Sequence, residues 1–307
     1  MDAHPNLPSA PASGNGRPPG DRRAMKVARL SVITASLLGA MKLTAASMTG
    51  SMAIAGSFVD SLTDVFASSV NLVAIRIGSR PADDDHRFGH GKAEGLAGMF
   101  QGAVIGFSGF FLVTESVRRL LEHRTAEREM TGVIVMAIAC VASVWITWLL
   151  RRTAKATGSV ALLADSAHYA SDVYMNGGVL ASLLLERFTH WEWLDPVVGL
   201  LVAAIVLKSS WTVLRASMDE LMDRDLGARV EDEIRRAVLA VVPEARDVRS
   251  IRTRRSGRAR FVDLMVAFDR DLSFAEAHRL SERARTAVLT AVPDADVSVH
   301  ALSLIHI

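Results

Sequence analysis

The sequence predicts an α-helical membrane protein in which six transmembrane helices precede a small cytoplasmic α+β domain. Six segments before Arg215 carry about 20 mostly apolar residues each, the length that crosses a bilayer. Charged residues make up 22% of the chain, but they are sparse before Arg215 and dense after it. Two of the apolar segments also contain paired acidic or histidine residues, which points to a site within the membrane.

The composition divides the chain into three parts. Residues 1–24 are rich in Pro, Gly and Ser, which predicts a disordered tail, and they lack the apolar core of a secretory signal. Residues 25–214 form the predicted transmembrane domain, and residues 215–307 form the predicted soluble domain. The chain ends abruptly on the apolar run SLIHI, which is typical of a truncated or non-native terminus. The one cysteine, Cys140, cannot form an internal disulfide.

The predicted spans are 27–48, 53–77, 95–117, 131–150, 160–185 and 195–214. Glycine recurs through the third span, which favours close approach of another helix. The second and fifth spans contain the paired polar residues. Lys42 in the first span either pairs with these acids or extends toward the membrane interface, and we favour the second interpretation. Asn71 and Asn176 are expected to make hydrogen bonds between helices.

Lysine and arginine in the short loops predict that both termini are cytoplasmic. The loop between the first two spans has no basic residue, and the loop between the last two has only Arg187. The loop between the third and fourth spans opposes this orientation with four arginines. The predicted cytoplasmic side holds Arg22, Arg23, Lys26, Arg29, Arg76, Arg80, Arg87, Lys92, Arg151, Arg152 and Lys155.

The soluble domain is predicted to have the element order αββαβ, which suits two helices on a three-stranded sheet. Apolar residues alternate with period two from Val262 to Phe268, as in a strand with one buried face. Ser273 followed by Glu276 is a helix-start signal. The expected elements are a helix at 228–241, strands at 248–255 and 260–268, a helix at 274–292 and a strand at 296–302.

The two polar pairs predict a metal site inside the membrane. Asp60 and Asp64 in the second span, and His168 and Asp172 in the fifth, each lie four residues apart and therefore on one helix face. An unpaired carboxylate in hydrocarbon costs several kcal/mol, so the four side chains are expected to converge on a divalent cation. The alternative is that they are satisfied by hydrogen bonds between helices.

One imidazole and three carboxylates suit zinc foremost, and leave cadmium, iron(II), cobalt and manganese open. The ion would be a transported substrate, and no permanently bound cofactor is expected. A net charge of +2 without a basic, aromatic-rich run argues against nucleic acid. The sequence has no phosphate-binding glycine loop and no nucleophile–base constellation, so we do not expect an enzyme.

Five stretches carry a family resemblance: GSFVDSLTDVFASSVNL, RPADDDHRFGHGKAEGLAG, ALLADSAHYASDVYMNGG, LMDRDL and RTRRSGRARF. Together they resemble the cation diffusion facilitators, and are most similar to the bacterial zinc and iron efflux branch. The resemblance covers nearly all of residues 25–300 and implies a homodimeric divalent-cation exporter of the bacterial inner membrane. It assigns the transport site to Asp60, Asp64, His168 and Asp172.

The resemblance also implies sites outside the membrane. Asp83, His86 and His90 would form a second metal site, with the two histidines sharing an ion if the loop starts a helix; the alternative is a solvated acidic loop. Lys92 would pair with Asp223 and brace the cytoplasmic junction of the dimer.

Two further positions are less well determined. Asp165 either supports the transport site or faces the cytoplasm. In the soluble domain, only His278 and His300 fall on the ligand positions of the similar proteins. The others read Arg249, Met265 and Leu302, which are poor zinc ligands, so we expect the domain to dimerise without sensing metal.

The ligand set also predicts the energy source. Metal binding requires a neutral histidine and ionised aspartates, so it releases protons, and a site that alternates between the two sides would exchange metal for protons. Two other classes remain: a metal-gated channel, whose ions would leave a closed cage too slowly, and a membrane-tethered metal sensor.

Overall fold

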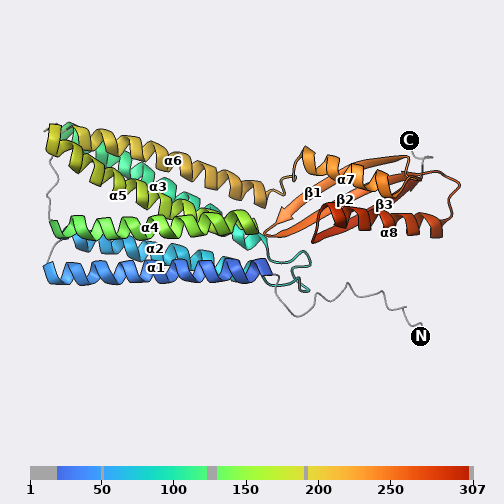
Figure 1. Cartoon of the computed structure of the whole chain (residues 1–307), viewed down its shortest axis with the longest axis horizontal. Coiled ribbons are helices and arrows are strands. Elements are labelled where there is room, and N and C mark those ends of the chain that lie inside the picture. The colour runs from blue at the N-terminus through green and yellow to red at the C-terminus, as the bar shows by residue number, and fades with distance from the viewer. Residues whose placement is uncertain (1–18, 50–51, 123–129, 190–192, 304–307) are drawn as a thin grey trace.

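The computed structural model describes residues 19–49, 52–122, 130–189 and 193–303. Six long helices lie side by side, and a soluble domain follows at one end of them (Figure 1). Residues 1–18 of the predicted tail and residues 304–307 of the terminal apolar run lie outside the described residues. The helices are α1 (Pro19–Thr49), α2 (Met52–Gly78), α3 (Lys92–Glu122), α4 (Met130–Thr157), α5 (Val160–Thr189) and α6 (Leu194–Leu221).

Five of these helices are long and apolar enough to cross a membrane. Helix α5 has 30 residues and carries Asp165, His168 and Asp172. Helix α5 begins at Val160 as predicted, and the other five helices extend past the predicted spans at both ends. The largest difference is at α1, which begins at Pro19 inside the segment expected to be a tail. Ala24 and Met25 explain this extension, because both are buried against the helical core.

Helix α3 packs closely on α6 through the glycines of the predicted third span. A methyl group on Gly102 would lie 2.9 Å from Leu214, and one on Gly106 would lie 2.8 Å from the Ser210 hydroxyl. Ser210 Oγ also donates a hydrogen bond to the Gly102 carbonyl at 2.7 Å. The predicted close helix approach is therefore confirmed.

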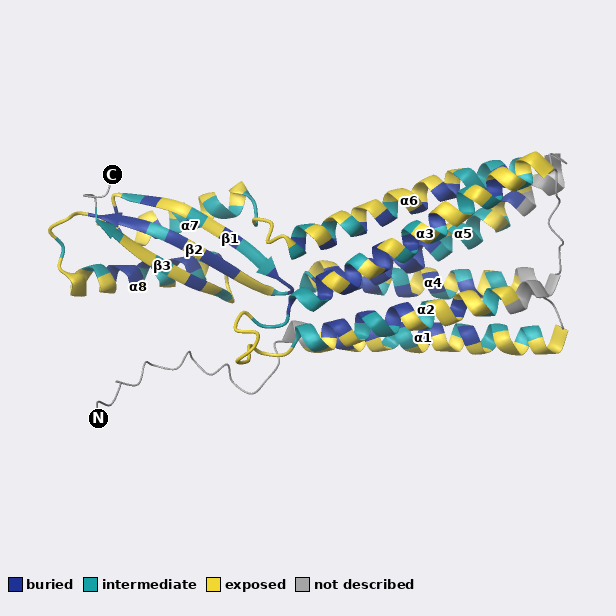
Figure 2. Ribbon diagram, turned by 180° about the vertical axis from the view of Figure 1, so that it is seen from behind, coloured by how far each residue is buried: buried dark blue, intermediate teal, exposed yellow. Residues whose placement is uncertain are grey.

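The soluble domain has the predicted αββαβ order: α7 (Ala228–Val241), β1 (Asp247–Ser256), β2 (Ala259–Phe268), α8 (Phe274–Ala291) and β3 (Ala295–Ser303). Strand β2 is central, antiparallel to β1 and parallel to β3. Its alternating residues from Val262 to Phe268 are buried in one core with side chains of α7 and α8 (Figure 2). Both helices therefore cover one face of the sheet.

The tip of the β1–β2 hairpin joins the soluble domain to the helical domain. Gly257 donates its backbone N–H to Glu220 on α6 at 2.8 Å, and Arg258 pairs with Glu94 on α3 at 3.4 Å. A side chain at Gly91 would collide with the Ser256 carbonyl, so glycine is required at this contact. Both acids are almost fully buried. The hairpin thus ties the sheet directly to α3 and α6.

Candidate functional site

Helices α2 and α5 bring three of the four predicted ligands together. The ligand atoms of Asp64, His168 and Asp172 all lie within 4.8 Å of one another. His168 Nε2 is 2.9 Å from Asp64 Oδ1, and the histidine side chain is only 8% exposed. Imidazole nitrogen and carboxylate oxygen are both zinc ligand atoms, so this arrangement can hold a divalent cation.

Asp60 lies outside this group of three. It is one helical turn from Asp64 on the same face of α2, and it is exposed. Lys42 does not pair with an acid among the described contacts; its Nζ donates to the Ser57 carbonyl at 3.2 Å.

The cluster is closed on the side of the soluble domain. Asp165, one turn before His168 on α5, is fully buried and does not face the cytoplasm. Its carboxylate accepts hydrogen bonds from Ser31 Oγ of α1 at 2.6 Å and from Ser68 Oγ of α2 at 3.0 Å. Tyr169 donates its hydroxyl to the Ser31 carbonyl at 3.0 Å. These contacts hold α1, α2 and α5 together on the soluble-domain side of the candidate metal ligands.

Exposure of the ligands increases away from this closed side. Asp165 is fully buried and His168 is buried, Asp64 and Asp172 are half-buried, and Asp60 is exposed. Along both α5 and α2, exposure of these side chains rises with distance from the soluble domain, toward the distal end of the helices. The candidate ligands are therefore more exposed toward the distal end than toward the soluble domain.

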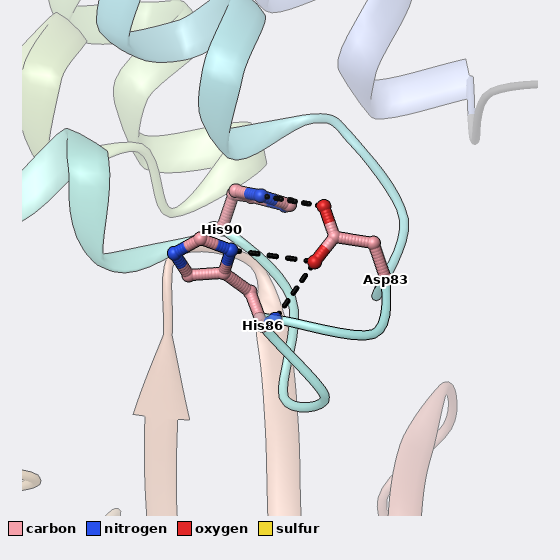
Figure 3. Close-up of side chains that lie close together, drawn as sticks. All are labelled: Asp83, His86 and His90. Carbon is pink, nitrogen blue, oxygen red and sulfur yellow. Dashed lines mark hydrogen bonds and ion pairs between the residues drawn. The ribbon is translucent and has the colours of Figure 1, made fainter.

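The loop before α3 forms a second group of potential metal ligands (Figure 3). Asp83 Oδ1 lies 3.3 Å from His86 Nδ1, and Asp83 Oδ2 lies 3.2 Å from His90 Nε2. The two imidazole rings are 4.5 Å apart between centroids. The histidines converge through turns and not through a helix, because α3 begins only at Lys92. The conditional expectation of helical spacing was therefore wrong, although the side chains still meet.

Charge and hydrogen bonding keep this loop group suited to a cation. The backbone N–H of His86 donates to Asp83 at 2.7 Å, and this bond, reinforced by the nearby imidazoles, lowers the pKa of the Asp83 carboxyl. Asp83 is consequently ionised at neutral pH. The Nδ1 atom of His90 is buried without a hydrogen-bond partner.

The predicted Lys92–Asp223 pair forms within one chain at 3.0 Å, with both side chains partly exposed. Arg254 of β1 contacts the other Asp223 oxygen at 3.3 Å, and Lys92 also donates to the Leu221 carbonyl. Partial burial acts to raise the pKa of the Asp223 carboxyl. The hydrogen bonds from Lys92 and Arg254 outweigh it, so the pKa lies below its usual value.

The soluble domain does not gather its predicted histidines into a site. Arg249, Met265 and His300 occupy one row across the three strands, and His278 is exposed on α8. Arg249 Nε is engaged by Asp247 at 2.7 Å. Within the described residues, no group of three potential ligands includes His278 or His300.

Several residues with evident roles were not singled out from the sequence. They are Ser31, Ser68 and Tyr169 around Asp165, and Glu94 and Glu220 at the hairpin tip. Glu94 and Glu220 lie outside the predicted spans 95–117 and 195–214, so the cost of a charge inside a span did not mark the second group. Serine and tyrosine are too common in helices to mark the first.

The fold and the group of potential ligands define a multi-pass membrane protein with a candidate cation site between two helices. The cation efflux transmembrane domain matches residues 28–222, and the cytoplasmic domain of cation efflux proteins matches residues 227–302. The chain therefore belongs to the cation efflux family, as the resemblance predicted.

Relatives match over most of the chain. The cation-efflux pump FieF of Shewanella oneidensis is 35% identical over 272 residues, covering 89% of this chain and 91% of the relative. FieF of Pectobacterium atrosepticum is 36% identical over 285 residues, covering 91% and 92%. Among solved structures, the MamM C-terminal domain in a nickel form aligns with a TM-score of 0.24 at 24% identity, covering 25% of this chain and 98% of that one.

Proposed function

We propose that this protein exports a divalent transition-metal ion, zinc foremost, from the cytoplasm in exchange for protons. The observation that carries the proposal is the group of Asp64, His168 and Asp172, held between two membrane-spanning helices and sealed on one side. Three ligands without a competing lysine or arginine in contact are suited to a cation. Asp60 lies one helical turn from Asp64 on the same face of α2, and we assign it as the fourth ligand when the metal binds.

Alternating access follows from the unequal exposure around the site. The packing of Asp165, Ser31 and Ser68 closes the path toward the soluble domain, while Asp60 is open to the other side. Transport would require this seal to open while the distal side closes. The basic loops favour cytoplasmic termini, so the arrangement corresponds to an outward-facing state in the bacterial inner membrane.

Coupling to protons rests on the chemistry of the ligands. A metal ion binds only to neutral imidazole and ionised carboxylate, so its arrival displaces protons and its departure admits them. His168 and Asp64 face each other at 2.9 Å, the distance of a hydrogen bond. A proton and a metal ion would therefore compete for the same two atoms.

The loop group, the junction and the sheet are assigned supporting roles. Asp83, His86 and His90 would bind a second ion beside the hairpin. Lys92 and Asp223 would brace the junction of a homodimer formed through the soluble domain. Iron(II), cadmium, manganese and cobalt remain alternative substrates. A tethered sensor is disfavoured, because the soluble domain would have to detect the ion with Arg249 at a ligand position.

Metal uptake into inverted vesicles tests the proposal. The purified chain should accumulate zinc only with an opposing proton gradient, and uptake should fall as the loading side is acidified. Asp172→Ala should abolish uptake. Glu115→Gln is the matched control, since this acid pairs with Arg119 on α3 outside the ligand group. Normal uptake by Asp172→Ala, or uptake indifferent to the proton gradient, would contradict the proposal.

A further inference from the structure

A groove between α4 and α5 lies apart from every metal ligand. It encloses about 520 Å³ and opens on the surface of the helical domain. Its apolar wall includes Val144, Trp148, Val173 and Tyr174, and its end nearest the soluble domain carries Arg151, Arg152 and Lys155. Neither the metal site nor the hairpin junction involves any of these residues.

The three basic side chains have no acidic partner. No ion pair to Arg151, Arg152 or Lys155 occurs among the described residues, whereas Arg254, Arg255 and Arg258 of the hairpin are paired with acids. All three are exposed. The Arg152 guanidinium lies 5.4 Å from the centre of the Trp148 ring, a cation–π contact that holds it over the groove. The groove therefore presents concentrated positive charge that no acid of the described residues neutralises by an ion pair.

The depth of these residues matches the headgroup region of a bilayer. Helix α4 has 28 residues and is about 42 Å long, which exceeds the hydrocarbon core of about 30 Å by about two turns. Its last turns, with Arg151 to Lys155, project beyond the hydrocarbon on the soluble-domain side. Trp148, at 55% exposed, and Tyr174, at 37%, lie deeper, where amphipathic rings contact lipid.

We propose that this groove binds one anionic phospholipid of the cytoplasmic leaflet. The arginines would hold its phosphate, since guanidinium groups bind phosphate oxygens in pairs. The upper part of an acyl chain would lie against Val144, Val173 and the aromatic rings. A free phosphate ion would satisfy the charge but would leave this apolar wall exposed, so the combined chemistry selects a lipid. Basic pockets between helices on the cytoplasmic side are suited to such headgroups.

The test is a lipid titration of the purified full-length protein in detergent, monitored by native mass spectrometry. Dioleoyl phosphatidylglycerol should bind at least about tenfold more tightly than dioleoyl phosphatidylcholine, which has the same chains but no net charge. The triple variant Arg151→Gln, Arg152→Gln, Lys155→Gln should lose this preference. Inorganic phosphate at millimolar concentration should not displace the bound lipid.

The control variant removes the same charge from the same end of the helical domain. Arg76→Gln, Arg80→Gln, Arg215→Gln changes three exposed arginines that do not line the groove, and it should bind phosphatidylglycerol as the unchanged protein does. If the triple variant fails to fold, the single exchange Lys155→Gln should still weaken binding about fivefold. Equal loss in the control, equal binding of both lipids, or displacement by phosphate would each overturn the assignment.

Discussion

His168 Nε2 and Asp64 Oδ1 lie 2.9 Å apart although the two residues are 104 positions apart in the chain. In the absence of metal, a proton shared by these two atoms satisfies both of them. Zinc would replace that proton and take the same nitrogen and oxygen as ligands. Under the proposed function, proton release and metal binding would therefore occur at one position, which is the requirement for an exchanger without a separate energy source.

Changing the imidazole to a carboxylate should alter metal selectivity. His168→Asp would give the site four carboxylates, a harder ligand set, so we expect preference to shift from zinc toward manganese. Competitive uptake of the two ions into vesicles measures the shift. His90→Asp provides the control, because it makes the same exchange in the loop group outside the membrane. An unchanged zinc-to-manganese ratio in His168→Asp would mean that selectivity is determined elsewhere.

The loop group should bind zinc independently of the intramembrane group. We expect about two zinc ions per chain for the unchanged protein and about one for Asp83→Ala, as measured by equilibrium dialysis. Zinc should leave the loop as the pH is lowered, because protons compete with the metal for the histidine nitrogens, while Asp83 with its lowered pKa stays ionised. His278→Ala should leave the stoichiometry unchanged. Identical stoichiometry in Asp83→Ala would remove the loop from the set of metal sites.

The sequence predicted the parts of the fold that depend on periodic patterns. Helix α7 and the buried positions of β2 match the prediction because period and packing agree there. The intramembrane ligands were predictable because charge is expensive in hydrocarbon. Partners of Asp165 were not predictable, since only the three-dimensional packing of α1 and α2 determines which serines reach it. The hairpin contact with Glu220 likewise joins residues 37 positions apart and has no local signature.

Acid should weaken the junction through Asp223. Its pKa is lowered in the folded protein, so the contacts with Lys92 and Arg254 stabilise the junction fully above the ordinary aspartate pKa of about 4 and are lost as the pH falls below it. Hydrogen exchange in residues 254–258 should therefore accelerate below about pH 4. Asp223→Asn should show faster hydrogen exchange in these residues already at neutral pH, and its exchange should accelerate less on acidification. Because the pair is partly exposed, the loss of stability at the junction should be about 1 kcal/mol or less.

Asp269 supplies the matched control for this measurement. Its pKa is also lowered, by a hydrogen bond from Arg246, but the pair lies at the end of the sheet away from the hairpin tip. Asp269→Asn should leave exchange in residues 254–258 unchanged at every pH. Equal effects of the two variants would show that the acid response belongs to the whole soluble domain and not to its junction.

The last prediction concerns the sheet row of Arg249, Met265 and His300, which are direct neighbours across the three strands. The isolated domain, residues 225–303, has its own core and should fold and dimerise without metal. Calorimetry with zinc should show weak binding or none, because an arginine occupies the row and His278 is apart from it.

Arg249→Asp combined with Met265→His should create binding, since neighbouring side chains in a sheet are close enough to share an ion. Arg252→Asp with Asp263→His makes equivalent changes at the next pair beyond the register shift in β1, two residues along β2. This variant should bind less tightly, because Ser298 and not a histidine completes that row. Tight binding by the unchanged domain would show that other residues have replaced the missing ligands, and the soluble domain would then regain a role in detecting the metal.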